Sequence, residues 1–327
     1  MLPGCLRVAL QSGCQSFQRS AGRISASTEQ RYAGIIRKHL KPALGSLLLG
    51  EIKPVHVEDV KTRWLTGKKS TAHRPLAPSS VHQQLVVLSE ALGEAERLQL
   101  MSRNPVSRVK SPSKGGHTER RILTEDEIRD VLEAANETSL DVLLRFALVT
   151  GLRIGEMLGL KWSDIDADAG TLLVQRNARQ QPGQGVVMDQ LKTKNARRLL
   201  ELSPETIALL SGHRTADRLR NLAAGSVWKD LDLVFCTTVG TAHSQPNLLR
   251  VLRKVRRQSE ISAPDQVTFH TFRHTAATHW IKAGSEIYAV SRRLGHADAA
   301  FTMNVYGHLL KGMQATAAGA FDHLIAG

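Results

Sequence analysis

The strongest constraint on the fold is a polar stretch at residues 107–118, with the sequence SRVKSPSKGGHT. It is rich in Ser, Lys, Gly and Pro and contains one aliphatic residue, Val109. This composition is typical of a linker and not of a helix or strand. A chain of 327 residues is also long enough for two domains. The sequence therefore predicts two domains joined by a linker at residues 107–118.

The two predicted domains differ in charge. The whole chain has 44 Lys and Arg against 30 Asp and Glu, a formal net charge of +14. Residues 1–116 contain 18 basic and 7 acidic side chains, whereas residues 117–327 contain 26 and 23. An excess of positive charge favours a polyanionic partner, with nucleic acid first and an anionic membrane surface second. We expect the N-terminal part to supply most contacts with the polyanion.

Helical signals dominate residues 27–106. Ser27 to Gln30 has the S-x-x-Q pattern of a capping box, and a second helix is expected after Pro54. Apolar side chains at helical spacing predict a third helix, which ends near Asn104: Val81, Leu85, Leu88, Leu92 and Ala95. Residues 1–26 are expected to form a disordered basic leader or the remnant of a longer N-terminal module. An organellar transit peptide is the alternative.

Residues 119–327 predict a second, mainly helical domain. Thr124 to Glu127 is another capping box, and Leu140 to Leu148 is an apolar helix. Short strands are expected at Leu172–Val174 and Arg198–Leu202, with a polar connection between them. Further helices are expected at Pro204–Leu222, Gln245–Gln258 and His270–Ala283. The predicted fold is mainly α with a small antiparallel sheet.

Several functional classes lack their sequence signals. No apolar run reaches the ~18–20 residues of a membrane span. The three cysteines are too sparse for a disulfide framework, which favours a reducing cytoplasm. The chain has neither a G-x-x-x-x-G-K-S/T phosphate loop nor a G-x-G-x-x-G motif, so ATP use is not indicated. We expect a cytoplasmic protein without a membrane partner or a nucleotide cofactor.

Two patterns hint at a metal, and both are incomplete. Asp164 to Asp168 resembles the start of a calcium loop, but Ala169 and Gln175 stand where the loop needs Gly and Glu. His270 and His274 have the i,i+4 spacing of zinc ligands, but no carboxylate ligand accompanies them. We therefore predict no metal site.

Four short motifs occur in order in the second domain. They are TGLRIGE at 150–156, HTFRH at 270–274, LGH at 294–296 and Tyr306, ten residues after His296. Singly each has an ordinary interpretation; Arg153 and Glu156, for example, are spaced for a structural salt bridge. In this order they resemble the tyrosine recombinase (phage integrase) family. That family has T-G-L/M-R-x-S/G-E, a hairpin lysine, H-x-L/F-R-H, L-G-H and a tyrosine nine or ten residues later.

The resemblance covers about residues 27–320. The hairpin motif corresponds to LKTK at 191–194, and the N-terminal helices are similar to the family's SAM-like core-binding domain. The resemblance implies a role for each matched residue. Tyr306 is the nucleophile that forms a 3′-phosphotyrosine, and Arg153 and Arg273 bind the phosphate oxygens. His270 is the general base, and Lys192, or alternatively Lys194, is the general acid. His296 donates a further hydrogen bond to the phosphate, and Glu156 orients the site.

These implied roles agree with the chemistry. A free tyrosine has a pKa near ~10 and needs help to attack at neutral pH. Two guanidinium groups stabilise the charge that builds on phosphorus. Exchange of a phosphodiester for a phosphotyrosyl ester stores the bond energy, so neither metal nor ATP is expected.

The resemblance also implies an assembly. The two domains would form a C-shaped clamp on duplex DNA, and four protomers would exchange strands between two DNA attachment sites. An accessory DNA-bending or directionality protein is a possible partner, and the tail from Gly312 to Leu324 is expected to dock on a neighbouring protomer. The expected function is integration or excision of a phage or another mobile element.

The sequence is also compatible with two other functions. A DNA-binding protein that cuts nothing would keep the fold but lose catalytic residues. A type IB topoisomerase would use related chemistry on single duplexes. Several further residues are interpreted as packing or supporting groups: His274, His279, His308, Trp64, Trp162, Trp228 and Trp280. The segment from Gly284 to His296 resembles part of a helix-turn-helix, but we expect it to carry His296 to the site.

Overall fold

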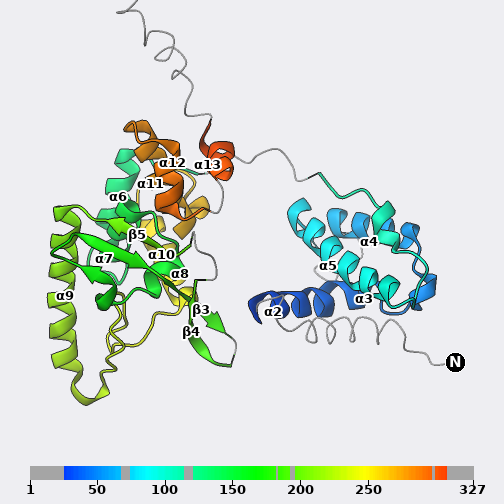
Figure 1. Cartoon of the computed structure of the whole chain (residues 1–327), viewed down its shortest axis with the longest axis horizontal. Coiled ribbons are helices and arrows are strands. Elements are labelled where there is room, and N and C mark those ends of the chain that lie inside the picture. The colour runs from blue at the N-terminus through cyan, green and yellow to red at the C-terminus, as the bar shows by residue number, and fades with distance from the viewer. Residues whose placement is uncertain are drawn as a thin grey trace, which may run out of the picture. The chain divides into compact units, whose positions relative to one another are not determined.

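The structure is a computed structural model that describes residues 26–67, 74–113, 121–181, 183–191, 196–296 and 299–307 (Figure 1). The chain divides into two compact units, Met1–Thr118 and Glu119–Gly327. The described residues of each unit surround a hydrophobic core of their own. Each unit is therefore organised around its own buried side chains.

The first unit is built from helices (Figure 1). Its elements are α2 (Ala26–Ile35), the π-helical segment η1 (Ile36–Leu40), α3 (Lys41–Leu44), the 3-10 turn η2 (Leu49–Glu51), α4 (Pro54–Thr66), α5 (Pro78–Arg97) and the 3-10 turn η3 (Pro105–Arg108). α4 and α5 each begin with a proline, a residue suited to the first turn because it has no amide hydrogen there to satisfy. The helices predicted after Pro54 and around residues 79–95 are confirmed.

The core of the first unit lies between α4 and α5. α5 buries the apolar residues that share one face of the predicted helix, and α4 contributes Val57, Val60 and Trp64. α5 ends at Arg97, earlier than the expected end near Asn104. The side-chain oxygen of Asn104 accepts from the Val106 amide at 3.0 Å and caps η3. Trp64 is a core residue at 4% exposure.

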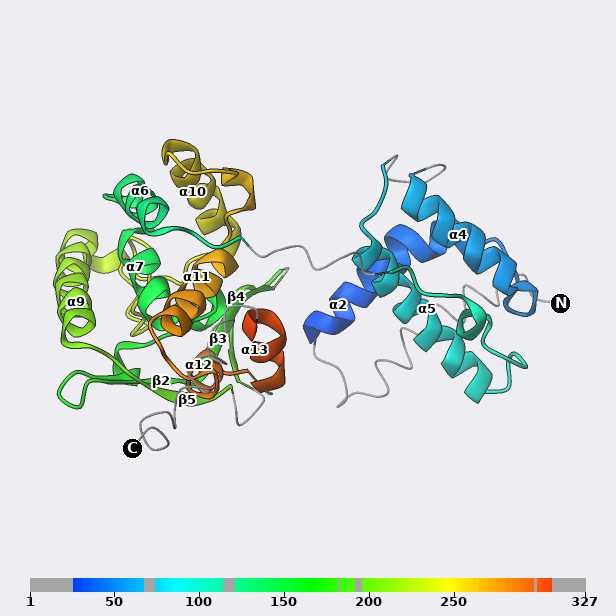
Figure 2. The same cartoon turned by 90° about the horizontal axis from the view of Figure 1, so that it is seen from above.

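The second unit is a mixed, mainly helical domain (Figure 2). Its helices are α6 (Glu125–Ala135), α7 (Asp141–Thr150), α8 (Ile154–Leu158), α9 (Pro204–Ala224), α10 (Gln245–Gln258), α11 (Phe269–Lys282), α12 (Ile287–Leu294) and α13 (Ala299–Tyr306). Its 3-10 turns are η4 (Trp162–Asp164), η5 (Gly225–Val227) and η6 (Pro264–Gln266). Its strands are β1 (Ile165–Asp166), β2 (Thr171–Val174), β3 (Arg176–Gln181), β4 (Gly185–Gln190) and β5 (Arg198–Glu201).

The strands form two small antiparallel sheets. One has the order β1-β2-β5, and Leu172 pairs with Leu200 at its centre. β3 and β4 form a separate hairpin in the segment that the sequence predicted to be a polar connection. β3, with the sequence RNARQQ, lacks the apolar alternation that signals a strand. β3 packs instead on α8, where a Cβ on Gly155 would lie 2.9 Å from the Ala178 carbonyl oxygen.

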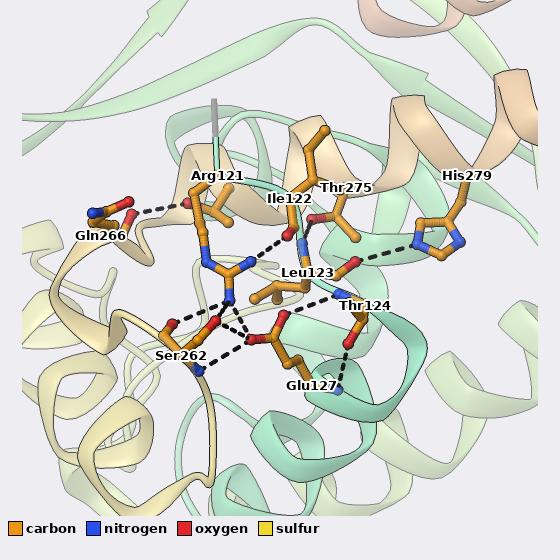
Figure 3. A network of polar contacts seen from close by, with 10 residues as sticks. Arg121, Ile122, Leu123, Thr124, Glu127, Ser262, Gln266, Thr275 and His279 are labelled. Atoms are coloured by element: carbon orange, nitrogen blue, oxygen red, sulfur yellow. Dashed lines mark hydrogen bonds and ion pairs between the residues drawn. The ribbon is translucent and has the colours of Figure 1, made fainter. Parts of the chain in front are cut away.

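The capping box at Thr124 is confirmed and belongs to a larger polar network (Figure 3). Thr124 Oγ1 accepts from the Glu127 amide at 3.2 Å, and Glu127 accepts from the Thr124 amide at 3.1 Å. The same carboxylate binds Arg121 and Ser262. Burial raises the pKa of Glu127, but hydrogen bonds from Arg121, Thr124 and Ser262 outweigh it and lower this pKa to about 2. The charged carboxylate thus joins the start of the unit to the loop after α10.

α11 forms the centre of the second unit and lies against α7 (Figure 2). Phe272 and Phe146 are fully buried in the main core. α11 is also joined to the segment before α6, since Thr275 Oγ1 accepts from the Leu123 amide at 3.0 Å (Figure 3). A third cluster joins α11 to α12 and α13. Its buried residues are Ala277, Ile281, Val290, Leu294 and Tyr306. α11 is therefore held on both sides.

Within the part of the chain that the structure describes, no helix has both the length and the apolar character needed to cross a membrane.

Candidate active site

The TGLRIGE motif forms the turn between α7 and α8. Gly151 ends α7 with φ +64, a conformation that favours glycine, and Arg153 is the N-cap residue of α8. A Cβ on Gly151 would lie 2.8 Å from the Trp280 ring and 2.9 Å from a Leu294 methyl group. The glycine therefore allows close contact between this turn, α11 and the end of α12, where the other motifs lie.

Glu156 is a buried carboxylate between two arginines. It is 3% exposed and accepts from Arg153 Nη1 at 2.9 Å and from Arg198 Nη2 at 3.0 Å. It also accepts from the Arg153 amide at 3.0 Å. Burial raises the pKa of Glu156, but the charges of Arg198 and Arg153 outweigh it and lower this pKa overall. The structural salt bridge expected from the Arg153–Glu156 spacing is present, and it fixes the direction of the Arg153 side chain.

Arg198 is the residue that sequence reasoning missed. It was interpreted only as the first residue of a strand, yet its guanidinium is 7% exposed and binds Glu156. It also donates to the Arg293 carbonyl at 2.7 Å and to the Ala196 carbonyl at 3.0 Å. A Cβ on Gly295 would lie 2.7 Å from Arg198 Nη1, so the glycine of the LGH motif makes room for it. No local pattern signals this role, because the contacts join segments far apart in sequence.

Arg273 is buried between two of the motifs. It is 4% exposed and donates to the Gly151 carbonyl at 2.7 Å and to the Leu294 carbonyl at 2.6 Å. Burial and the nearby charge of Arg153 lower its pKa to about 9, so it is mostly charged at neutral pH. The Glu156 carboxylate acts in the opposite direction. Arg273 thus brings positive charge to the point where the TGLRIGE and LGH motifs meet.

His296 follows α12 and points to α13. Its Nδ1 lies 2.7 Å from the hydroxyl of Thr302, which is fully buried. Burial lowers the pKa of His296 to about 4, and the charges of Arg273 and Arg153 add to this effect. The imidazole is therefore neutral at pH 7. A neutral ring that accepts the Thr302 hydroxyl at Nδ1 carries its proton on Nε2, the form that can donate to an anion.

Tyr306 lies at the end of α13 with its ring in the third apolar cluster and is 2% exposed. Its hydroxyl oxygen is 2.6 Å from Nδ1 of His274. From the sequence, His274 was interpreted as a packing or supporting residue. In the structure its side chain is within hydrogen-bonding distance of the phenolic oxygen of Tyr306. His270 lies one turn earlier on α11, is exposed, and has its ring centroid 6.5 Å from that of His274.

Not every predicted site residue can be located. Lys192 and Lys194 lie outside the described residues, between the end of β4 and the start of β5. His308 and the segment from Gly312 to Leu324 also lie outside them. The structure does bring five residues together: Arg153, Glu156, Arg198, Arg273 and His296. Arg153 and Arg198 bind Glu156 directly, and Arg273 binds the Gly151 and Leu294 carbonyls. His296 is close enough for the charges of Arg273 and Arg153 to lower its pKa.

The histidines of α11 point to different partners. His274 contacts Tyr306, while His279 Nε2 lies 3.4 Å from the Leu123 carbonyl (Figure 3). Among the residues with described positions, no group of three or more His, Cys, Asp or Glu is arranged to hold a metal. Asp164, the first residue of the incomplete calcium-loop pattern, binds Arg176, Gln175 and the Lys161 amide.

The arrangement has the chemistry of an anion site. Arg153 and Arg198 bind the carboxylate of Glu156, and the charge of Glu156 also acts on the pKa of Arg273. Three arginines with one carboxylate leave an excess of positive charge. The Arg153 side chain is 37% exposed and can reach a ligand, whereas the side chains of Arg273 and Arg198 are buried. Forked guanidinium donors suit a phosphate or a developing negative charge on phosphorus.

Comparison with known proteins identifies the class and then the family. Residues 121–313 match the model of the phage integrase family, and residues 17–65 match that of the N-terminal SAM-like domain of phage integrases. The first match covers more than half of the chain, so this protein belongs to the phage integrase family, the tyrosine recombinases. The family and the predicted fold class, a SAM-like helical domain and a mainly helical domain with small antiparallel sheets, are confirmed.

Two curated relatives illustrate the match. A tyrosine recombinase XerC-like protein of Caldanaerobacter subterraneus subsp. tengcongensis is 33% identical over 226 residues, which cover 64% of this chain and 57% of that protein. An integrase of Streptomyces ambofaciens is 27% identical over 311 residues, which cover 92% of this chain and 76% of that protein. The match thus spans little more than half the length of the first relative.

Solved structures share the fold. The Tn1549 transposon integrase in complex with a circular intermediate DNA aligns with a TM-score of 0.74 and 19% identity, covering 91% of this chain and 94% of that one. A lambda integrase dimer bound to a COC′ core site aligns with a TM-score of 0.65 and 22% identity, covering 90% and 94%. At these identities the likeness extends to the fold alone.

Proposed function

We propose that this protein is a site-specific recombinase that cuts and rejoins duplex DNA through a 3′-phosphotyrosine and so integrates or excises a phage or another mobile element. The observation that carries the proposal is the convergence of Arg153, Arg273 and His296 beside α13, which bears Tyr306. Family membership supports it. The Bacillus subtilis ICEBs1 integrase, 26% identical over 271 residues, is a further relative whose name refers to a mobile element.

In the proposed reaction Tyr306 attacks the phosphorus of one DNA strand. The new O–P bond forms while the bond to the 5′-oxygen breaks, and Arg153 and Arg273 stabilise the charge on the phosphate oxygens. His296 donates a further hydrogen bond from its neutral ring. Lys192, or alternatively Lys194, protonates the leaving 5′-oxygen. Glu156 holds Arg153 in place and takes no part in proton transfer.

The reaction conserves the energy of the broken bond. The phosphotyrosyl ester replaces one phosphodiester, and attack by a 5′-hydroxyl reverses the step on the same or another duplex. The proposal therefore includes no ATP and no metal ion.

The first test is covalent trapping. We expect a denaturant-resistant protein–DNA adduct when the protein meets nicked duplexes from the DNA that flanks its gene, in EDTA and without ATP. Strand exchange between two differently labelled duplexes should follow, which separates a recombinase from a type IB topoisomerase that only relaxes one duplex. Tight DNA binding without any adduct would favour the non-cutting function instead.

We also propose the division of labour that the charges suggest. Residues 27–106 would form a core-binding domain after a basic leader at 1–26, residues 107–118 a linker, and residues 119–327 the catalytic domain. Together the two domains would close around duplex DNA as a clamp. The first unit displays many exposed basic side chains, which support this role: Arg31, Arg37, Lys41, Lys53, Arg74, Arg103, Arg108 and Lys110.

DNA affinity should therefore depend steeply on salt. Each phosphate that the protein neutralises releases counterions. A protein with several such contacts therefore loses about a thousandfold in DNA affinity when the salt concentration rises from 50 to 200 mM. A binding titration across this range measures the slope. Simultaneous replacement of Arg31, Arg37 and Lys41 by Gln should make the slope shallower; an unchanged slope would contradict the assignment of these phosphate contacts to the first unit.

The proposed partners extend beyond one duplex. A lambda integrase tetramer bound to a Holliday junction shares the fold, with a TM-score of 0.65 at 22% identity. By analogy we propose a homotetramer that joins two attachment sites, with Gly312 to Leu324 docking on a neighbouring protomer. An accessory bending or directionality protein is a further proposed partner. A cytoplasmic location with the nucleoid, or with phage DNA, would fit this activity.

A further inference from the structure

The hydroxyl of Tyr306 is paired in the structure with His274, one helical turn after His270, the residue that the family resemblance implies is the general base. Nδ1 of His274 lies 2.6 Å from the phenolic oxygen, a normal length for a short O–H···N hydrogen bond. The two ring centroids are 6.0 Å apart. His274 therefore touches the atom that would attack phosphorus.

Both partners are held by their surroundings. The Tyr306 ring packs with Ile281, Val290 and Leu294 in the third apolar cluster. His274 is half-buried on α11, between Arg273, which binds two backbone carbonyls, and Thr275, which accepts from Leu123. The proton acceptor is therefore in contact with the phenolic oxygen before the reaction begins.

His270 occupies a different position. It lies one helical turn before His274 on α11 and is exposed. Its ring centroid is 6.5 Å from that of His274.

We propose that His274, and not His270, accepts the phenolic proton of Tyr306 when the tyrosine attacks DNA. This inference rests on the proposed function, in which Tyr306 is the nucleophile. As the O–H bond breaks, the proton passes to Nδ1, the O–P bond forms, and the 5′-oxygen leaves with a proton from the general acid. In rejoining, the proton returns from Nδ1 to the tyrosine oxygen. The reaction requires the neutral tautomer with its proton on Nε2.

The test uses three variants of the whole protein in single-turnover cleavage of nicked duplexes from the flanking DNA. His274→Ala removes the acceptor. His274→Asn keeps a polar group that can hydrogen-bond the phenol, but it cannot take up a proton. His279→Ala is the matched control, since it removes another half-buried histidine of α11 that faces the Leu123 carbonyl.

We expect both His274 variants to form the adduct about a hundredfold to ten thousandfold more slowly, as for the loss of a general base. His279→Ala should stay within a few-fold of wild type. Full activity in either His274 variant overturns the proposal. So does faster cleavage, which would mean that His274 restrains the tyrosine. DNA binding and thermal unfolding identify any variant that is misfolded, and the near-isosteric Asn variant then decides.

A second substrate separates the two proton transfers. A duplex with sulfur in place of the bridging 5′-oxygen has a leaving group that needs no proton. The defect of the His274 variants should persist on this substrate, because attack by tyrosine still requires loss of the phenolic proton. A defect that disappears with sulfur would assign His274 to the leaving group and overturn the inference.

The same assay distinguishes this inference from the proposed function. If wild type forms no adduct, or forms it equally in Tyr306→Phe, the proposed function itself fails. If wild type forms an adduct through Tyr306 while the His274 variants match it, only the role of His274 fails.

Discussion

Tyr306→Phe is expected to abolish the covalent protein–DNA adduct while leaving DNA binding intact. The phenylalanine ring fills the same space among Ala277, Ile281, Val290 and Leu294, so the apolar packing is retained. The variant loses the hydrogen bond to His274, and we expect a loss of about 1 kcal/mol in the free energy of unfolding. Cleavage, in contrast, loses its only proposed nucleophile.

The matched control for this variant is Tyr288→Phe. Tyr288 lies on α12 in the same unit but is 62% exposed, so its hydroxyl is outside the buried site. Adduct formation is measured by gel after denaturation, and binding is measured in parallel. Tyr288→Phe should form the adduct like wild type. Adduct formation by Tyr306→Phe would show that another side chain attacks the DNA.

Arg198→Ala is expected to destabilise the second unit by about 3 kcal/mol, because removal of one partner leaves a buried charge less compensated. Glu156 is 3% exposed and would retain Arg153 but lose the bonds from Arg198. The carbonyls of Arg293 and Ala196 would also lose a donor. Ala196 adjoins the segment with Lys192 and Lys194, so we expect slower cleavage as well.

Arg197→Ala provides the comparison. Arg197 precedes Arg198 in sequence but is exposed, and loss of an exposed side chain typically changes stability by less than about 0.5 kcal/mol. Urea unfolding of the second unit compares the two variants. Equal stability of Arg198→Ala and Arg197→Ala would mean that the buried ion cluster contributes nothing to the fold.

Much of the fold follows from local sequence signals. α10 spans Gln245–Gln258 as predicted, and α9 and α11 differ from their predicted bounds by one or two residues. These helices have clear periodicity and defined ends, and such signals depend on neighbouring residues alone. The β3–β4 hairpin was not predicted as paired strands, since its stability comes partly from packing on the glycines of α8 and not from its own pattern.

The family, the helical character of both units and the order of the motifs follow from the amino-acid sequence alone, because each motif is local and the order of the motifs is specific. Tertiary structure alone decided which groups meet: Arg198 with Glu156, Arg273 with the Gly151 and Leu294 carbonyls, and His274 with Tyr306. These contacts join residues 21 to 122 positions apart, and only the packing of α7, α8, β5, α11, α12 and α13 brings them within hydrogen-bonding distance.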